Sequence, residues 1–235
     1  MQAFLRNREL IGGKMINILL EGYNIDEPWL YDALKGYLKP THRVAVVAFS
    51  FRDTSVRNAS DWMAFYGKEN GRFYKAIVKG IGSYGIPSEN ISFINYFTDT
   101  METAKEIIKE ADILYFLGGL PDKMMERIRE FELTDTLARF DGIVMGYSAG
   151  ALIQLAEYHL SPDRDYPEFG YYGGLPYLKG FYLEVHYEGR DEQNEAIRRV
   201  LSERNAPVYA TASMRGAIIV DAGVIKPLGD VRIFK

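Results

Sequence analysis

The chain has 235 residues, and 47% of them are hydrophobic, which is enough to build one domain with a sizeable core. Its 28 basic and 32 acidic residues give a formal net charge of -4. The chain therefore lacks the positive excess that binds a phosphate backbone, and we expect no nucleic-acid partner. It also has no cysteine, which excludes disulfides, thiolate metal ligands and a cysteine nucleophile. Any covalent catalyst must be a serine, threonine, lysine or carboxylate.

The first 14 residues contain only a short apolar patch. A signal peptide needs a longer hydrophobic region, and no later run approaches the roughly 18 apolar residues of a membrane span. We therefore expect a cytoplasmic protein with no membrane partner. Residues 1–14 are interpreted as an N-terminal extension. Residues 15–235, which show no repeat or linker, are expected to form a single α/β domain.

Apolar runs rich in β-branched residues alternate with segments of helical spacing along the first two thirds of the chain. The predicted strands are 16–20, 44–49, 91–97, 113–117 and 142–146, and the predicted helices are 28–37, a long stretch within 59–81, 101–111 and 121–131. Strands that are apolar throughout are buried on both faces. The alternation therefore predicts a three-layer sandwich, a mostly parallel sheet with helices on both faces.

The pattern is looser after the fifth predicted strand. A loop rich in Tyr, Pro and Gly (160–176) precedes a predicted strand at 181–186 and a helix at 191–203. Two or three short strands are expected between there and the last residue.

The strongest local motif is Gly146-Tyr147-Ser148-Ala149-Gly150, a G-x-S-x-G sequence between a buried run and a predicted helix, 149–157. In this context the serine occupies a sharp strand-to-helix turn that exposes its hydroxyl at the carboxyl edge of the sheet. The nearby helix N-terminus favours developing negative charge. The motif predicts a nucleophile at Ser148. The alternative is a tight turn in which the serine only caps the helix.

A serine hydroxyl needs a base, and the chain has three histidines. His42 precedes the second predicted strand and so belongs at the opposite edge of the sheet. His159 lies at the far end of the predicted helix, about 16 Å along its axis. His186 ends the predicted strand 181–186 at the carboxyl edge and is the favoured base, although a half-exposed histidine at a strand end is the alternative. Three scattered histidines offer no ligand pair, so we expect no metal and no cofactor.

Paired glycines follow the fourth predicted strand at Gly118 and Gly119. Glycines let the backbone approach a substrate closely, and a free N–H there, together with that of Ala149, would form an oxyanion hole. A Gly-Gly turn alone is weak evidence, but beside a nucleophile elbow it is stronger.

Taken together, Gly118-Gly119, Gly-Tyr-Ser-Ala-Gly-Ala and the later His186 resemble the peptidase E family of serine dipeptidases, which includes cyanophycinase relatives. The resemblance covers about residues 15–203. It implies a fold like that of the class I glutamine amidotransferases, a flavodoxin-like three-layer sandwich with serine in place of their cysteine. It also implies a small peptide substrate, since peptidase E removes an N-terminal aspartate from dipeptides and cyanophycinase cuts aspartyl-arginine units.

Residue by residue, the resemblance implies that Ser148 is the nucleophile, His186 the base, and Gly119 and Ala149 the oxyanion donors. The acid of the family lies in an Asp-x-Pro setting, which Asp165-Tyr166-Pro167 resembles, with Asp163 as the alternative. Leu120-Pro121 stands where many members have an amide side chain, which leaves the substrate open.

An acidic substrate would need a cation in the pocket. Arg52, Arg57 and Arg190 follow predicted strands at the expected edge, and Glu21 is placed to hold an amino group, but each of these is equally a candidate surface charge. The aromatic segment 166–177 either walls the pocket or covers the core. Two other functions remain open: an ester or amide hydrolase that uses the same elbow, and a non-catalytic binding relative.

Overall fold

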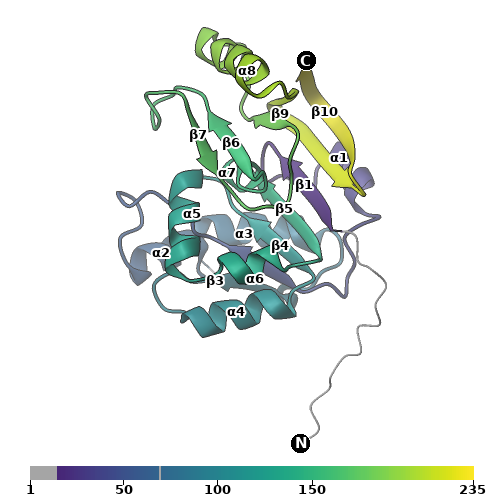
Figure 1. The fold of residues 1–235 in the computed structure, drawn as a ribbon. Helices are drawn as coiled ribbons and strands as arrows, with labels where there is room; N and C mark the ends of the chain where they lie inside the picture. The colour runs from purple at the N-terminus through teal and green to yellow at the C-terminus, as the bar shows by residue number, and fades with distance from the viewer. Residues whose placement is uncertain (1–14, 69) are drawn as a thin grey trace, which may run out of the picture.

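The computed structural model describes residues 15–68 and 70–235, so the predicted extension 1–14 lies outside the described residues (Figure 1). The main sheet has eight strands. They are β1 (Ile16–Leu20), β2 (Val44–Val47), β3 (Ile91–Ile94), β4 (Ile113–Phe116), β5 (Ile143–Tyr147), β8 (Tyr182–Glu184), β9 (Val208–Asp221) and β10 (Val224–Phe234). Their order across the sheet is β10-β9-β1-β5-β4-β2-β3, and β8 pairs with β9.

The centre of the sheet is parallel. The strands β1, β5, β4, β2 and β3 run in the same direction, whereas β9 is antiparallel to β1 and to β10. Alternate side chains enter two different clusters: in β4, Tyr115 packs on one face and Phe116 on the other. Because both faces are covered, the central strands are apolar throughout, as their sequences indicated. Their carboxyl ends meet at one edge of the sheet.

Helices cover both faces of this sheet, which confirms the predicted three-layer α/β architecture (Figure 1). One face packs against α1 (Pro28–Leu34), α2 (Ala59–Tyr66) and α3 (Arg72–Gly82). The other packs against α4 (Met101–Glu110), α5 (Pro121–Glu130), α6 (Thr134–Ala138) and α7 (Ala149–Leu152). A further helix, α8 (Asp191–Arg204), packs its Ile197 and Val200 against β8 and β9.

The predicted helix 149–157 is wrong beyond its first turn. After α7 the chain enters β6 (Glu157–Leu160), which pairs with β7 (Gly170–Gly173) inside the predicted loop. The carbonyls of Ile153 and Gln154 accept from the N–H groups of Leu175 and Leu178 at 2.7 and 3.1 Å. A distant segment therefore takes the backbone groups that a longer helix would have used.

Two other predicted elements also differ. The long helix within 59–81 is two helices, α2 and α3, and the N–H of Gly71 donates to the carbonyl of Gly67 at 2.9 Å between them. A Cβ on Gly71 would lie 2.6 Å from the Gly67 backbone. At the other end of the chain, the short strands expected there are two long ones, β9 and β10.

Candidate active site

Ser148 lies at the turn between β5 and α7, at the carboxyl edge of the sheet. Its backbone has φ 52° and ψ -117°, a conformation that non-glycine residues rarely adopt. The flanking glycines leave no room for side chains: a Cβ on Gly146 would lie 2.3 Å from the Gly150 oxygen, and one on Gly150 would lie 2.1 Å from the Phe116 oxygen. The N–H of Ser148 donates to the carbonyl of Leu20 at 2.9 Å. The motif thus forms a nucleophile elbow held against its neighbouring strands.

His186 follows β8 and reaches the elbow. Its Nε2 lies 2.8 Å from the Oγ of Ser148, within hydrogen-bond range for a nucleophile and its base. The imidazole is half exposed, at 49% of its side-chain surface, so it borders an open site. Like the serine, the histidine has a left-handed backbone, with φ 55°.

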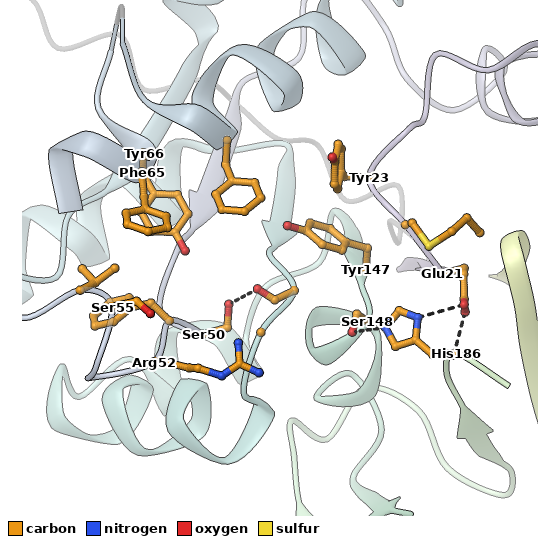
Figure 2. Close-up of a pocket in the computed structure, with 17 residues that line it drawn as sticks. Glu21, Tyr23, Ser50, Arg52, Ser55, Phe65, Tyr66, Tyr147, Ser148 and His186 are labelled. Carbon is orange, nitrogen blue, oxygen red and sulfur yellow. Dashed lines mark hydrogen bonds and ion pairs between the residues drawn. The ribbon is translucent and has the colours of Figure 1, made fainter. Parts of the chain in front are cut away.

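Glu21, directly after β1, lies behind the imidazole. Its Oε1 lies 3.0 Å from His186 Nδ1, and its Oε2 accepts the backbone N–H of His186 at 3.1 Å. The hydroxyl of Thr211, on β9, also donates to Oε2. The hydrogen bond to Glu21 raises the pKa of His186 above its usual 6.5, although burial acts in the opposite direction. Ser148, His186 and Glu21 therefore form one hydrogen-bonded chain (Figure 2).

The backbone beside Ser148 includes two N–H groups that face no protein acceptor. Within residues 15–68 and 70–235, neither the N–H of Gly119 nor that of Ala149 has a hydrogen-bond acceptor. Gly119 has φ 146°, and a Cβ there would lie 2.2 Å from the Ser50 oxygen, so the turn requires glycine. Ser50 holds this turn, since its Oγ donates to the Gly118 carbonyl at 2.7 Å and its carbonyl accepts from Leu120 N–H at 2.7 Å.

A cavity of about 300 Å³ opens beside Ser148, His186 and Gly119 (Figure 2). Six aromatic side chains line it, namely Tyr23, Phe51, Phe65, Tyr66, Phe73 and Tyr147. Reactive groups at the edge of an apolar pocket are the usual arrangement of an enzyme site.

Comparison with known proteins assigns the chain to a family. Residues 69–223 match the model of peptidase family S51. The chain belongs to this family. It is therefore a peptidase, and the predicted relationship to the peptidase E family is confirmed.

Solved structures agree with the S51 assignment at the level of the fold. A putative peptidase E protein from Listeria monocytogenes EGD-e is similar with a TM-score of 0.63 at 14% identity, covering 92% of this chain and 99% of that one. A peptidase from an acI-B1 Actinobacterium is similar with a TM-score of 0.60 at 16% identity, covering 95% and 92%. These similarities confirm the flavodoxin-like three-layer fold. A search of curated proteins found no match.

Asp165 was expected to be the acid beside the base, but in the structure of this S51 peptidase it does not contact His186. Both carboxylate oxygens of Asp165 bond to the guanidinium of Arg52, and Glu21 is the carboxylate that reaches His186 Nδ1. Asp163 is also occupied elsewhere, because its Oδ1 accepts the backbone N–H groups of Asp165 and Tyr166 at 2.7 and 2.8 Å. The expectation fails because the loop that carries both residues folds back onto Arg52.

Glu21 was one open candidate to hold a substrate amino group, and in the structure both of its oxygens are instead engaged with His186 and Thr211. Its position directly after a buried strand was visible in the sequence. Its pairing with His186 was not, because the two residues are 165 positions apart.

The other two histidines of the S51 peptidase form hydrogen bonds with residues other than Ser148. His159 is buried in β6 rather than at a helix end, and its Nε2 lies 2.8 Å from Glu184 Oε2. His42 lies in the loop before β2, where its Nδ1 accepts the Lys39 N–H at 3.3 Å. Elimination therefore selected the histidine that contacts Ser148, although the helical position that it assumed for His159 was wrong.

The three arginines that were candidates to bind an acidic substrate lie in different places. Arg52 lines the cavity, whereas Arg57 pairs with Asp61 at 3.1 Å and Arg190 lies 3.5 Å from Glu188, both outside the cavity lining. The described residues contain no group of His, Asp or Glu that could hold a metal ion. In the same part of the chain, none of the helices has the length and apolar character needed to cross a membrane.

Proposed function

We propose that this S51 peptidase hydrolyses short peptides, dipeptides among them, through an acyl-enzyme on Ser148, with His186 as the base and Glu21 as the acid. The observation that carries the proposal is the 2.8 Å approach of His186 Nε2 to the Oγ of a serine in a strained elbow. A hydroxyl in this position is exposed to substrate and has its proton acceptor already in place.

The first half of the reaction uses all three side chains. His186 Nε2 takes the proton of Ser148 Oγ as this oxygen attacks the substrate carbonyl carbon. The negative charge moves to the carbonyl oxygen, where the N–H groups of Gly119 and Ala149 are the proposed donors. Glu21 accepts a hydrogen bond from Nδ1–H, which fixes the tautomer that leaves Nε2 free and stabilises the imidazolium.

The intermediate collapses when the carbon–nitrogen bond breaks and His186 Nε2 returns its proton to the leaving amine. The acyl group remains as an ester on Ser148. Water then enters, gives a proton to Nε2 and attacks the ester carbonyl, and the serine leaves as the hydroxyl after it recovers that proton. The products are a free carboxylate and an amine, and the enzyme is unchanged.

The resemblance to peptidase E and the name of the similar Listeria protein support a dipeptidase. The cytoplasmic location and the lack of a nucleic-acid partner remain predictions from the sequence.

A fluorophosphonate label tests the nucleophile. We expect the folded protein to be labelled at Ser148 alone, as mapped by mass spectrometry, and Ser148→Ala to lose labelling and peptide hydrolysis while keeping its fold. Labelling at another serine, or none, would contradict the proposal. A labelled enzyme that hydrolyses p-nitrophenyl esters but no peptide would favour the ester hydrolase.

A further inference from the structure

Two cavities meet at His186. The first, described above, reaches Ser148, Gly118 and Gly119. The second, of about 480 Å³, reaches Glu21 and His186 and is lined by Asp230 and Arg232, but Ser148 does not line it. Met214 lines both and stands where they meet.

The direction of proton transfer indicates which cavity receives the leaving group and which receives the residue whose carbonyl is attacked. His186 must protonate the leaving amine, so the leaving group lies on the imidazole side, toward the second cavity. The residue whose carbonyl is attacked lies on the side of Ser148 and Gly119, so its side chain enters the first cavity. The first cavity therefore sets the preference for the acyl residue.

The wall of the first cavity is aromatic and continuous. The rings of Phe65 and Phe73, from α2 and α3, stack at a centroid distance of 6.1 Å. Tyr23 contacts Phe73 at 6.4 Å and Tyr147 at 5.5 Å, both edge to face. Tyr66 also lines the cavity, and Figure 2 shows Tyr147 and Tyr23 toward Ser148, with Phe65 and Tyr66 on the opposite side of the view. Such a wall stabilises a large apolar side chain through burial and ring contacts.

The charges around the cavity do not favour a carboxylate. Arg52 is the one lysine or arginine among its described lining residues, and its guanidinium already binds both oxygens of Asp165. The other cationic group, His186 when protonated, is bound to Glu21. A substrate carboxylate here would lose its hydration without gaining an unpaired cation, which is unfavourable.

We propose that the acyl-side cavity selects a peptide with an aromatic or large apolar residue at the position attacked and discriminates against aspartate. This inference rests on the proposed function, because that function defines the acyl side. It departs from the aspartyl preference that the sequence resemblance implied, and Arg52 is the reason: the cation that an acidic substrate needs is neutralised within the protein.

Binding to Ser148→Ala tests the preference without catalysis. Isothermal titration calorimetry with Phe-Ala, Asn-Ala and Asp-Ala keeps the leaving residue constant, and Asn-Ala separates the effect of charge from that of size. We expect Phe-Ala to bind about 10- to 100-fold more tightly than Asp-Ala, the range that burial of one large apolar side chain supports. Asp-Ala binding as tightly as Phe-Ala, or no difference among the three dipeptides, would overturn the proposal.

A pair of variants on one helix locates the preference. Phe65→Ala, made in the Ser148→Ala background, should reduce the Phe-Ala to Asp-Ala affinity ratio by at least about threefold, since part of the wall is lost. Met63→Ala is the matched control, because Met63 is 48% exposed on the same helix and lies outside the cavity lining. If Phe65→Ala does not fold, Phe65→Leu replaces it. An unchanged ratio in the folded Phe65 variant would overturn the proposal.

Hydrolysis by the wild type separates this inference from the proposed function. Cleavage of these dipeptides with Asp-Ala preferred would overturn the pocket assignment and leave the Ser148 mechanism standing. A clear preference in binding without any cleavage or fluorophosphonate labelling would support an aromatic pocket and count against the mechanism.

Discussion

Glu21 holds His186 at two points, through the imidazole Nδ1 at 3.0 Å and through the backbone N–H at 3.1 Å. The side chain of Glu21 is 2% exposed. The same carboxylate therefore orients the ring toward Ser148 and helps to hold the left-handed backbone of His186, which has φ 55°.

Glu21→Gln should reduce kcat by roughly 10³- to 10⁴-fold, the scale seen when the triad acid of a serine protease becomes an amide. The amide can present an N–H to Nδ1 and so favour the wrong tautomer of His186. The measurement is kcat on an activated ester and on one dipeptide, with circular dichroism to show that the variant is folded. A folded variant with nearly wild-type kcat would remove Glu21 from the mechanism.

The raised pKa of His186 predicts the pH dependence of the reaction. The base must be neutral, so kcat/KM should rise with pH and its acid limb should lie above pH 6.5. In Glu21→Gln the main cause of the raised pKa is lost, and the residual activity should show its acid limb at lower pH. An acid limb at the same pH in wild type and Glu21→Gln would contradict the assignment of Glu21 as the acid beside His186.

The contribution of His186 to stability should fall as pH rises, whereas its contribution to activity should increase. Because folding raises the pKa of His186, its contribution to stability is fully present below about pH 6.5 and is lost as pH rises through the folded-state pKa. Thermal unfolding of wild type and His186→Gln should therefore differ more at pH 5.5 than at pH 8.5. An equal difference at both pH values would show that the pKa is not shifted.

Asp165→Asn should leave kcat within about tenfold of wild type, because the carboxylate pairs with Arg52 and not with the imidazole. The loss of this partly exposed pair should cost less than about 1 kcal/mol of unfolding free energy. Asp163→Asn is the control, since its Oδ1 can still accept the same two backbone N–H groups. A loss of kcat as large as that of Glu21→Gln would restore Asp165 as the acid.

His159→Gln should affect folding rather than chemistry. His159 is buried and bonds to the buried Glu184, so loss of this partner should lower the free energy of unfolding by about 1–3 kcal/mol. Urea unfolding measures this cost, and kcat per folded molecule should be retained. His42→Gln, in a loop, should change stability by no more than about 0.5 kcal/mol. A stable but inactive His159→Gln would show that this residue takes part in the reaction.

Local pattern predicted much of the fold and part of the site. β1 was predicted with its observed bounds, and the ends of β2, β4 and β5 were predicted to within two residues, because apolar strands buried on both faces show an uninterrupted local pattern. The elbow at Ser148 was equally visible, since Gly146 and Gly150 are required by backbone contacts only a few residues away or on the adjacent strand. His186 was selected by elimination among the three histidines, but the strand direction assumed for it was wrong, because β8 is parallel to β9 and therefore runs opposite to the central strands.

The sequence by itself determined the parallel sheet, the elbow and the order of serine and histidine, because these follow from spacing and burial within short segments. Only the tertiary structure decided that Glu21 rather than Asp165 reaches the imidazole, that α7 ends at Leu152, and that Arg52 is neutralised beside an aromatic cavity. Each of these depends on a contact between distant segments: Glu21 with His186, the 153–156 backbone with 174–178, and Arg52 with the loop at Asp165. A carboxylate or a backbone carbonyl can bond to any suitable donor within about 3 Å, and which donor comes within that distance is set by the packing of the whole fold.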